Sequence, residues 1–283
     1  MRRLIVLSVA ALLAASAAAA APKAAKAPPP PKDSDWRTPD AANVLIIDTN
    51  KGRVIVELVP EVAPEHVKQM LKLAHERAYD GRTFFRVIDR FMVQTGDVPA
   101  PGDGKDTVPT LKAEFTFRRG ADSRFVAVNA PQGTETGLLL SLPVISQHIS
   151  YTEMTSDKKV AAWGTYCPGV VGMARDDNPD SATSQFFMMR YAYPSLDKRY
   201  TAFGRVISGQ EVIRAIKTGE PVEAPQDVMQ TVRVLADIPE AERPKIRIID
   251  AKSPWFGAYA DQVKKAKGAD FSVCDLELPV EVK

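Results

Sequence analysis

Cysteine and histidine are scarce in this chain, with only two cysteines and three histidines among 283 residues. The cysteines are too far apart in sequence for a C-x-x-C motif, and His66, His75 and His148 do not follow the spacing of metal ligands. The sequence also has no P-loop and no G-x-S-x-G motif. Thiol-redox, nucleotide-hydrolysing and serine-hydrolase functions therefore have no support, and we predict no metal ion and no cofactor.

An excess of charge of either sign is missing too. The chain has 37 basic and 35 acidic residues, and its formal net charge is +2. Domains that bind nucleic acid usually carry a clear basic excess, so we predict no nucleic-acid partner. Apolar residues make up 45% of the chain and charged residues 25%, as is usual for a globular protein. We predict a monomer.

A strongly apolar run occurs only at the N-terminus. Residues 1–3 include two arginines, residues 4–13 are apolar apart from one serine, and residues 17–21 are all alanine. This order is that of a secretory signal peptide, which we place at residues 1–21. An uncleaved membrane anchor is the alternative, but the apolar core is shorter than the ~20 residues that a bilayer span needs. We therefore predict a periplasmic protein without membrane attachment after cleavage.

Proline is abundant, with 22 in the chain and four in succession at residues 28–31. Consecutive prolines favour a stiff, extended and solvated chain. We interpret residues 22–38 as a Pro/Ala-rich linker between the signal peptide and the folded part. A ligand for a proline-binding domain is the alternative interpretation.

The two cysteines, Cys167 and Cys274, allow two interpretations. In an oxidising compartment such a pair can form a disulfide, which would tie the C-terminal tail to the strand that starts near Val170. Two separate buried thiols are the other possibility. The residues alone leave both open.

Short β-branched and apolar runs recur along the chain and predict strands. Residues 44–47 and 53–58 flank a segment with the Asn and Gly of a tight turn, which predicts a β-hairpin. The other predicted strands are residues 83–88, 91–94, 169–174, 185–189, 202–206, 232–235 and 245–249.

Two amphipathic segments predict helices. One starts at Ala63, with Pro64 in its first turn, and the other covers residues 211–216. The apolar face of the first, at helical spacing, consists of Val67, Met70, Leu71 and Ala74. Many short strands with two helices favour an antiparallel barrel capped by helices.

Two further segments extend this core. Residues 118–159 mix Gly, Pro, Ser and Thr with one apolar patch, and we predict an inserted loop with little structure that has a functional or lid role. Residues 256–283 are charged with scattered apolar positions, and we predict a C-terminal extension. The predicted domain between the linker and this extension covers residues 39–255.

Three sequence blocks carry a family resemblance. Residues 84–97 read FFRVIDRFMVQTGD, residues 172–187 contain GMAR and DSATSQFF, and residues 196–206 contain LD and AFGRV. These blocks resemble, in the same order, the motifs of cyclophilin-type peptidyl-prolyl cis/trans isomerases. The second block resembles the bacterial periplasmic branch. The match covers residues 43–98 and 163–216.

The resemblance implies a mainly β fold, a closed eight-stranded antiparallel cyclophilin-like barrel with two capping helices. By position, Arg86 matches the catalytic arginine and Gln94 the glutamine beside it. The residues that match the family's substrate-binding positions are Phe91, Met92, Ala174, Arg175, Gln185, Phe187, Leu196 and Tyr200. Since neighbours in a strand point to opposite faces, we expect Phe186 in the core and Phe187 toward the substrate, or the reverse.

Three positions depart from the eukaryotic pattern. Ser195 stands where many members carry tryptophan, Tyr200 where they carry histidine, and Phe85 where the residue before the arginine is commonly histidine. The exchange at Tyr200 resembles the bacterial branch. These differences bear on the affinity for cyclosporin-like ligands and on the catalytic rate.

The chemistry implied needs no nucleophile. Rotation about an X–Pro amide is opposed by ~18–20 kcal/mol of C–N resonance, and an enzyme lowers this barrier by binding the twisted amide best. A guanidinium such as that of Arg86 is suited to the prolyl nitrogen, which gains a lone pair in the twisted state. We predict an isomerase of proline-containing unfolded or exported polypeptides. A non-enzymatic proline-peptide-binding or chaperone module on the same barrel is the alternative.

Overall fold

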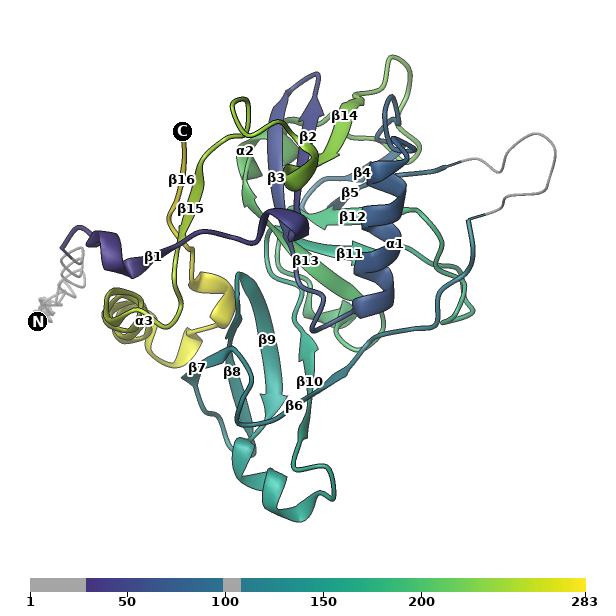
Figure 1. Cartoon of the computed structure of the whole chain (residues 1–283). Helices are drawn as coiled ribbons and strands as arrows, with labels where there is room; N and C mark the ends of the chain where they lie inside the picture. Colours follow the sequence, from purple (N-terminus) through teal and green to yellow (C-terminus); the bar gives the residue numbers. More distant parts are fainter. Residues whose placement is uncertain (1–28, 99–107) are drawn as a thin grey trace, which may run out of the picture.

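The computed structural model describes residues 29–98 and 108–283 (Figure 1). The predicted signal peptide, residues 1–21, lies outside the described residues, and so does the predicted linker up to residue 28. The described strands form three sheets, of eight, five and three strands. The mainly β fold is therefore confirmed.

The eight-stranded antiparallel sheet is the predicted barrel. Its order is β14-β2-β3-β13-β11-β12-β5-β4. It curls, and no ladder joins its edge strands β14 and β4 in the described residues; two isolated bridges, Thr83–Val228 and Val87–Gly219, connect the chain at and before β4 with the segment before β14. The strands are β2 (Val44–Thr49), β3 (Gly52–Leu58), β4 (Arg86–Ile88), β5 (Met92–Thr95), β11 (Val170–Met173), β12 (Phe186–Met189), β13 (Ala202–Ser208) and β14 (Met229–Val234).

The first hairpin shows why its strands are apolar on both faces. Strands β2 and β3 pair from Val44–Glu57 to Thr49–Gly52, as the turn residues predict. Leu45 and Ile47 belong to the barrel core, whereas Val44 and Ile46 belong to a separate apolar cluster. Alternating side chains thus pack into two different cores, which excludes water from both faces.

Helices α1 (Pro64–His75) and α2 (Gln210–Ala215) are the two predicted helices. Along α1, a buried face at helical spacing packs on the barrel core and consists of Val67, Met70, Leu73 and Ala74. Proline occupies the first turn of α1, where its missing N–H costs no hydrogen bond. In Figure 1, α1 lies along one side of the barrel sheet.

The N-terminus of α1 is held by a carboxylate from a distant segment. Glu114 accepts hydrogen bonds from the backbone N–H groups of Glu65 and His66, and its Oε2 lies 2.7 Å from the His66 Nδ1. Burial by itself raises the pKa of Glu114, but the hydrogen bonds from His66 and Glu65 outweigh it, so the pKa lies below its ordinary value.

We expect Glu114→Gln to lower the free energy of unfolding by about 1 kcal/mol at pH 7. Since the folded-state pKa of Glu114 is lower than the unfolded-state pKa, the contribution is present above the unfolded-state value and is lost as the pH falls through the folded-state value. The difference between wild type and variant should therefore shrink toward pH 3. Urea unfolding at both pH values measures it, and an equal difference at both would contradict the assignment.

The prediction of an inserted loop with little structure is wrong. The insertion is a five-stranded antiparallel sheet with the order β6-β10-β9-β8-β7. Its strands are β6 (Phe117–Arg119), β7 (Phe125–Asn129), β8 (Thr134–Leu139), β9 (Leu142–Gln147) and β10 (Val160–Gly164). The β8–β9 turn consists of Leu140, with φ at 56°, and Ser141. A two-residue turn normally carries Asn or Gly, so the hairpin had no turn signal in the sequence.

A third sheet joins the two ends of the described chain (Figure 1). It contains β1 (Trp36–Arg37), β15 (Ile246–Ile249) and β16 (Val280–Val282), in the order β1-β15-β16. Two predictions are corrected here, because residues 36–37 belong to a sheet and not to the linker, and residues 245–249 do not complete the barrel. The predicted C-terminal extension supplies the strand β16. Strands of two and three residues are too short to show a period in the sequence.

The C-terminal extension also contributes to a third α-helix, α3 (Pro254–Lys267), which begins before the predicted boundary at residue 256. Ser253 caps its first turn by accepting a hydrogen bond from the Phe256 N–H. Phe256 and Ala260 are buried in the same apolar cluster as the insertion's Leu138. The extension is therefore packed into the fold.

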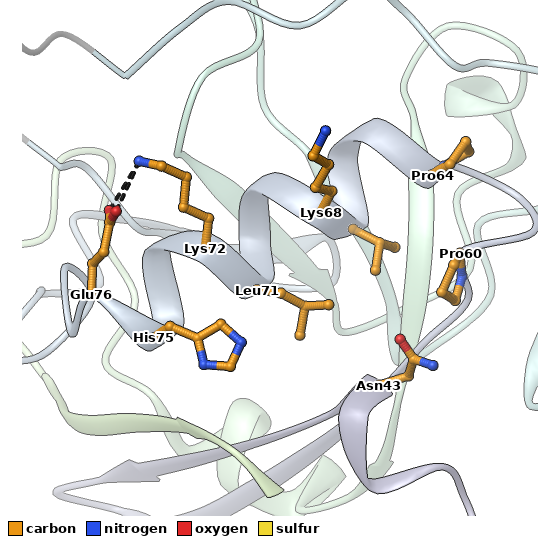
Figure 2. Close-up of a pocket in the computed structure, with 9 residues that line it drawn as sticks. Asn43, Pro60, Pro64, Lys68, Leu71, Lys72, His75 and Glu76 are labelled. Carbon is orange, nitrogen blue, oxygen red and sulfur yellow. Dashed lines mark hydrogen bonds and ion pairs between the residues drawn. The ribbon is translucent and has the colours of Figure 1, made fainter. Parts of the chain in front are cut away.

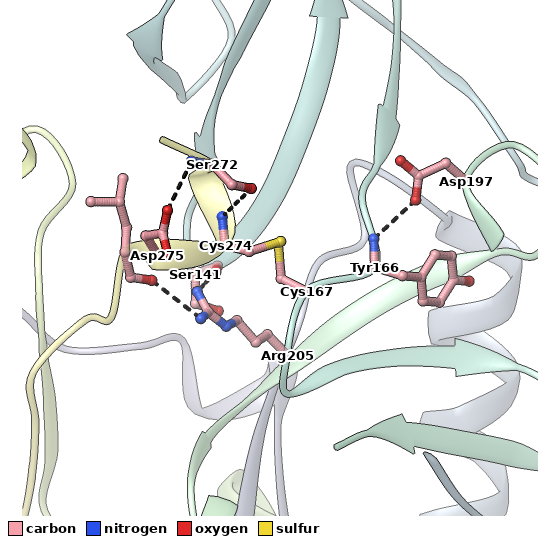
Figure 3. The surroundings of a disulfide bond; sticks show 9 residues. Ser141, Tyr166, Cys167, Asp197, Arg205, Ser272, Cys274 and Asp275 are labelled. Carbon is pink, nitrogen blue, oxygen red and sulfur yellow. Dashed lines mark hydrogen bonds between the residues drawn. A yellow bond between two sulfur atoms is a disulfide. The ribbon is translucent and has the colours of Figure 1, made fainter. Parts of the chain in front are cut away.

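Cys167 and Cys274 are joined by a disulfide (Figure 3). Cys167 lies between β10 and β11, and Cys274 belongs to the 3-10 helix η7 (Val273–Asp275) of the extension. The two cysteines are separated by 107 residues in sequence. Of the two interpretations that the residues left open, the disulfide is the one found.

A buried arginine marks the place where barrel, insertion and extension meet (Figure 3). Arg205 of β13 donates through Nη1 to the carbonyl oxygen of Ser141 and through Nη2 to that of Leu276. Burial lowers the pKa of Arg205 to about 10, so it remains a cation at neutral pH. Removing such a charge from water requires hydrogen-bond partners, and here they come from two other parts of the chain.

In residues 29–98 and 108–283, no helix is both long and apolar enough to cross a bilayer. The same residues contain no group of three or more His, Cys, Asp or Glu side chains placed to hold a metal ion.

Candidate functional site

Three directly opposed residues on adjacent strands form the centre of the candidate site. Arg86 of β4 pairs with Gln94 of β5, and Gln94 pairs with Phe187 of β12. Directly opposed residues point to the same face of a sheet. Phe186 lies in the barrel core and Phe187 in a second apolar cluster, so the three residues lie on the outer face. The predicted separation of the two phenylalanines is confirmed.

Side-chain hydrogen bonds connect the polar members of this face. The Arg86 Nη1 donates to the Gln94 Oε1 at 3.2 Å, and the Gln94 Nε2 donates to the Gln185 Oε1 at 2.9 Å. The three predicted polar residues Arg86, Gln94 and Gln185 therefore lie together.

Two carboxylates that we did not predict terminate this chain of hydrogen bonds. The Arg86 Nε donates to the Glu220 Oε1 at 2.6 Å, and the Gln185 Nε2 donates to the Asp97 Oδ1 at 2.9 Å. We call the set Glu220, Arg86, Gln94, Gln185 and Asp97 the polar row. Asp97 ends the first motif block and could have been found from it. Glu220 has no such signal, because it lies 134 residues from Arg86 in sequence.

The remaining predicted residues, apart from Arg175, form an apolar wall beside the polar row. All of them belong to one apolar cluster, in which Met92, Phe187 and Leu196 are buried and the others are partly buried. The apolar wall consists of Phe91, Met92, Ala174, Phe187, Leu196 and Tyr200. Tertiary structure thus brings together side chains from three separate motif blocks.

The ring of Phe187 is held by two tyrosines. Tyr166 stacks on it with ring centroids 5.7 Å apart, and Tyr200 meets it edge-on at 5.9 Å. Gly172 pairs with Phe187 across β11 and β12 and leaves room for the rings of Phe187 and Tyr166. A Cβ at Gly172 would lie 2.6 Å from the Phe187 Cζ and from the Tyr166 hydroxyl. Tyr166 was not predicted, because it stands outside the motif blocks.

Tyr166 also supports the segment that carries Leu196. Its backbone N–H donates to the Asp197 Oδ1, and its carbonyl oxygen accepts from the Tyr193 N–H. Between these two residues lies the 3-10 helix η4 (Pro194–Leu196). Burial raises the pKa of Asp197, although hydrogen bonds from Thr165 and Tyr166 oppose this. The main chain at Tyr166 therefore positions one end of the apolar wall.

The Arg175 guanidinium makes several hydrogen bonds within the chain. Its Nε and Nη2 both donate to the carbonyl oxygen of Arg199, and its Nη1 donates to that of Asp176. The guanidinium lies over the Tyr200 ring, 4.6 Å from the centroid. The backbone N–H of Ala174 is also engaged within the chain, because it donates to the Gln185 carbonyl oxygen. These bonds fasten the segment beside Tyr200.

A separate surface hollow of about 480 Å³ lies along α1 (Figure 2). Figure 2 shows Leu71 and His75 on the side of α1 that faces Asn43, with Lys68 and Lys72 above them. No predicted site residue lines this hollow. We therefore place the candidate site at the polar row and the apolar wall, and not along α1.

Comparison with known proteins identifies the family. Residues 44–237 match the family model described as "Cyclophilin type peptidyl-prolyl cis-trans isomerase/CLD". The chain is 34% identical over 195 residues to a Brucella suis protein named "Probable peptidyl-prolyl cis-trans isomerase", covering 65% of this chain and 76% of that protein. It is 29% identical over 195 residues to "Peptidyl-prolyl cis-trans isomerase-like 1" of Aspergillus fumigatus, covering 68% and 94%.

A solved structure extends the similarity beyond the barrel. The crystal structure of cyclophilin AquaCyp293 from Hirschia baltica superimposes with a TM-score of 0.80 at 32% identity, covering 87% of this chain and 93% of that one. Because the coverage exceeds residues 44–237, the similarity includes parts of the chain outside the family model.

Proposed function

The chain belongs to the cyclophilin-type peptidyl-prolyl cis-trans isomerase family and has that activity; from this premise, we propose that Arg86 stabilises the transition state of X–Pro rotation in exported proteins. The observation that supports this most is that Arg86, Gln94 and Phe187 lie opposite one another on the outer face of the sheet. It sets a guanidinium beside an apolar wall, the two features that a twisted prolyl amide requires.

Arg86 supplies the charge of the proposed transition-state complex. In the twisted amide the prolyl nitrogen is no longer conjugated with the carbonyl and becomes a hydrogen-bond acceptor. The Arg86 Nε is bonded to Glu220 and its Nη1 to Gln94, whereas its Nη2 has no hydrogen bond to the described residues. We therefore assign the Nη2 as the donor to the prolyl nitrogen. A bond made only in the twisted state raises kcat, because it does not stabilise the planar forms.

The apolar wall holds the pyrrolidine ring while the preceding residue turns. Phe187, Met92 and Leu196 form the buried base of this wall, and the partly buried Phe91 extends it, with its ring 4.6 Å from the Tyr193 ring. Gln185 and Ala174 border the polar side of this surface and are proposed to contact the residue before proline. Tyr200 adds its ring edge-on to that of Phe187. Arg175 contributes by fastening the main chain at Arg199, the residue before Tyr200.

The alternative of a non-enzymatic binding module is not favoured. The substitutions at Ser195, Tyr200 and Phe85 leave Arg86, Gln94 and the apolar wall assembled. The insertion is an ordered sheet whose Leu138, Leu139 and Leu142 share an apolar cluster with the site.

NMR exchange spectroscopy of a short Ala-Pro-Phe peptide tests the proposed activity. With catalytic amounts of the mature protein, the cis and trans signals should exchange much faster than the uncatalysed tens to hundreds of seconds. Exchange that stays at the uncatalysed rate with folded protein would refute the proposed function. The same sample without enzyme gives the reference rate.

We propose that the protein is periplasmic, on the basis of the signal-peptide layout of residues 1–21. Expression of the full chain in a bacterium should yield a mature protein that begins near residues 17–22 and is released with the periplasmic fraction. Intact mass measurement of that fraction determines the new N-terminus. A Leu7→Arg variant, which interrupts the apolar core, should remain uncleaved inside the cell. An intact wild-type chain in the membrane fraction would instead establish the anchor alternative.

A further inference from the structure

Glu220 forms the shortest contact that Arg86 makes within the polar row. The Arg86 Nε–Glu220 Oε1 distance is 2.6 Å, against 3.2 Å for the Arg86 Nη1–Gln94 Oε1 bond. The side chains are 38% and 55% exposed. An ion pair this exposed contributes little to stability. The pair matters because it involves the proposed catalytic arginine, Arg86.

The backbone around Glu220 is braced against the strand that carries Arg86. Val87 and Gly219 exchange two hydrogen bonds, each of 2.8 Å, and the Val222 N–H donates to the Phe85 carbonyl oxygen at 2.9 Å. These bonds lie on either side of the Arg86–Glu220 pair. The carboxylate is therefore presented to Arg86 by a fixed main chain and is not a chance contact of two long side chains.

The opposite end of the polar row fixes Arg86 from its other side. Asp97 accepts only, so the Gln185 amide must turn its NH₂ group toward Asp97 and its oxygen toward Gln94. Gln94 must then turn its NH₂ group toward Gln185 and its oxygen toward Arg86. The two carboxylates thus orient the whole row, and the guanidinium has an acceptor at each of two edges.

The same arrangement places a negative charge where a substrate side chain would otherwise pair with the arginine. An acidic residue next to the isomerised proline could form a fork-like pair with Arg86 and draw it away from the prolyl nitrogen. Glu220 already occupies the Nε edge of Arg86. Because it belongs to the same chain, it needs no binding step to do so, and its charge repels a carboxylate of the substrate. A basic or neutral neighbour meets no such repulsion.

We propose that Glu220 positions the Arg86 guanidinium and makes the enzyme discriminate against acidic residues next to the isomerised proline, so that neutral and basic segments are its preferred substrates. The inference rests on the proposed role of Arg86. It adds to that role a substrate preference and a residue that determines it.

Two Ala-Pro peptides that carry either a Lys or a Glu directly after the proline, and are otherwise identical, test this preference. With the wild-type protein at low salt, kcat/KM for the Lys peptide should exceed that for the Glu peptide by roughly threefold or more. In Glu220→Gln the ratio should fall toward one, because the charge is lost while a hydrogen-bond acceptor remains. Glu220→Ala should in addition lower kcat/KM for a neutral peptide about three- to tenfold through loss of positioning.

Glu223→Gln is the matched control. Glu223 is exposed and lies in the same segment as Glu220, and its substitution by Gln removes the same charge. It should leave the Lys/Glu ratio at the wild-type value, whereas high salt should reduce that ratio in the wild type. A purely structural role for Glu220 would lower all rates by one factor, and an unchanged ratio in Glu220→Gln would overturn the inference. If the wild type does not accelerate exchange of the neutral peptide at all, the proposed function itself fails.

Discussion

Replacing Arg86 with alanine is expected to lower kcat/KM for an X–Pro peptide by about 10²–10³-fold, the order found when one donor aimed at transition-state charge is removed. The Arg86 Nη2 is the donor that we assign to the prolyl nitrogen. The alanine side chain leaves the apolar wall intact, so the peptide should still bind. The loss should therefore fall mainly on kcat, because the interaction exists only in the twisted state.

Arg86→Lys sharpens the same prediction. Lysine keeps the charge but not the planar fork, so it cannot bond Glu220 and Gln94 and still donate to the prolyl nitrogen in the same geometry. We expect a loss of at least about tenfold, intermediate between wild type and alanine. NMR exchange rates at several peptide concentrations separate kcat from KM.

The control for both variants is Arg214→Ala. Arg214 is an exposed arginine on α2, outside the polar row and the apolar wall, and its removal should leave the rate unchanged. Thermal unfolding of all three variants should stay near the wild-type midpoint, because the Arg86–Glu220 pair is exposed. A folded Arg86→Ala protein with wild-type kcat/KM would remove Arg86 from the mechanism.

Loss of the Cys167–Cys274 disulfide is expected to destabilise the protein by about 2–5 kcal/mol. The bond closes a loop of 107 residues that includes the strands β11 to β15 and the helices α2 and α3. In the chain-entropy description, a loop of about 100 residues corresponds to ~4.7 kcal/mol, and native strain or residual structure reduces this. The double variant Cys167→Ser/Cys274→Ser measures the effect without a reactive free thiol.

Urea unfolding of the oxidised wild type and of the double variant, at equal protein concentration, gives this difference. Wild type treated with a reductant should approach the unfolding midpoint of the variant. The double variant should unfold at the same midpoint with and without reductant, which separates the disulfide from other effects of the reagent. Equal midpoints for oxidised wild type and variant would show that packing alone holds the extension in place.

The disulfide also lies one residue from the site. Cys167 follows Tyr166, whose ring stacks on Phe187 and whose main chain bonds Tyr193 and Asp197. We therefore expect the loss of stability in the double variant to be accompanied by a smaller loss of activity, a few-fold in kcat/KM. The reason is that the segment with Leu196 keeps its own hydrogen bonds when the sulfur–sulfur bond is absent.

Local patterns were sufficient for the barrel and for most of the site. The β2–β3 hairpin, helix α1 and the separation of Phe186 from Phe187 follow from alternation, helical spacing and turn residues, which act over a few positions. The motif blocks place Arg86, Gln94 and the apolar wall together, as the structure finds them. Their backbone pairs are set by strand register, which the apolar pattern specifies.

Short or atypical elements escaped the same reasoning. The β8–β9 turn uses Leu140 and Ser141 instead of Asn and Gly, and β1 and β16 contain too few residues for a period to be seen. Their strands are stabilised by partners elsewhere in the chain. Arg37 of β1, for example, forms a bidentate ion pair with Glu57 of β3. Such partners have no counterpart in local sequence.

The amino-acid sequence by itself therefore determined the barrel strands, the two predicted helices, the family and the residues of the candidate catalytic face. Tertiary structure alone decided that the insertion is a sheet, that the two ends of the described chain share another, and that Glu220 completes the polar row. The physical reason is distance along the chain. Propensity and periodicity act between near neighbours, whereas the contact of Arg86 with Glu220 spans 134 residues and depends on the path of every segment between them.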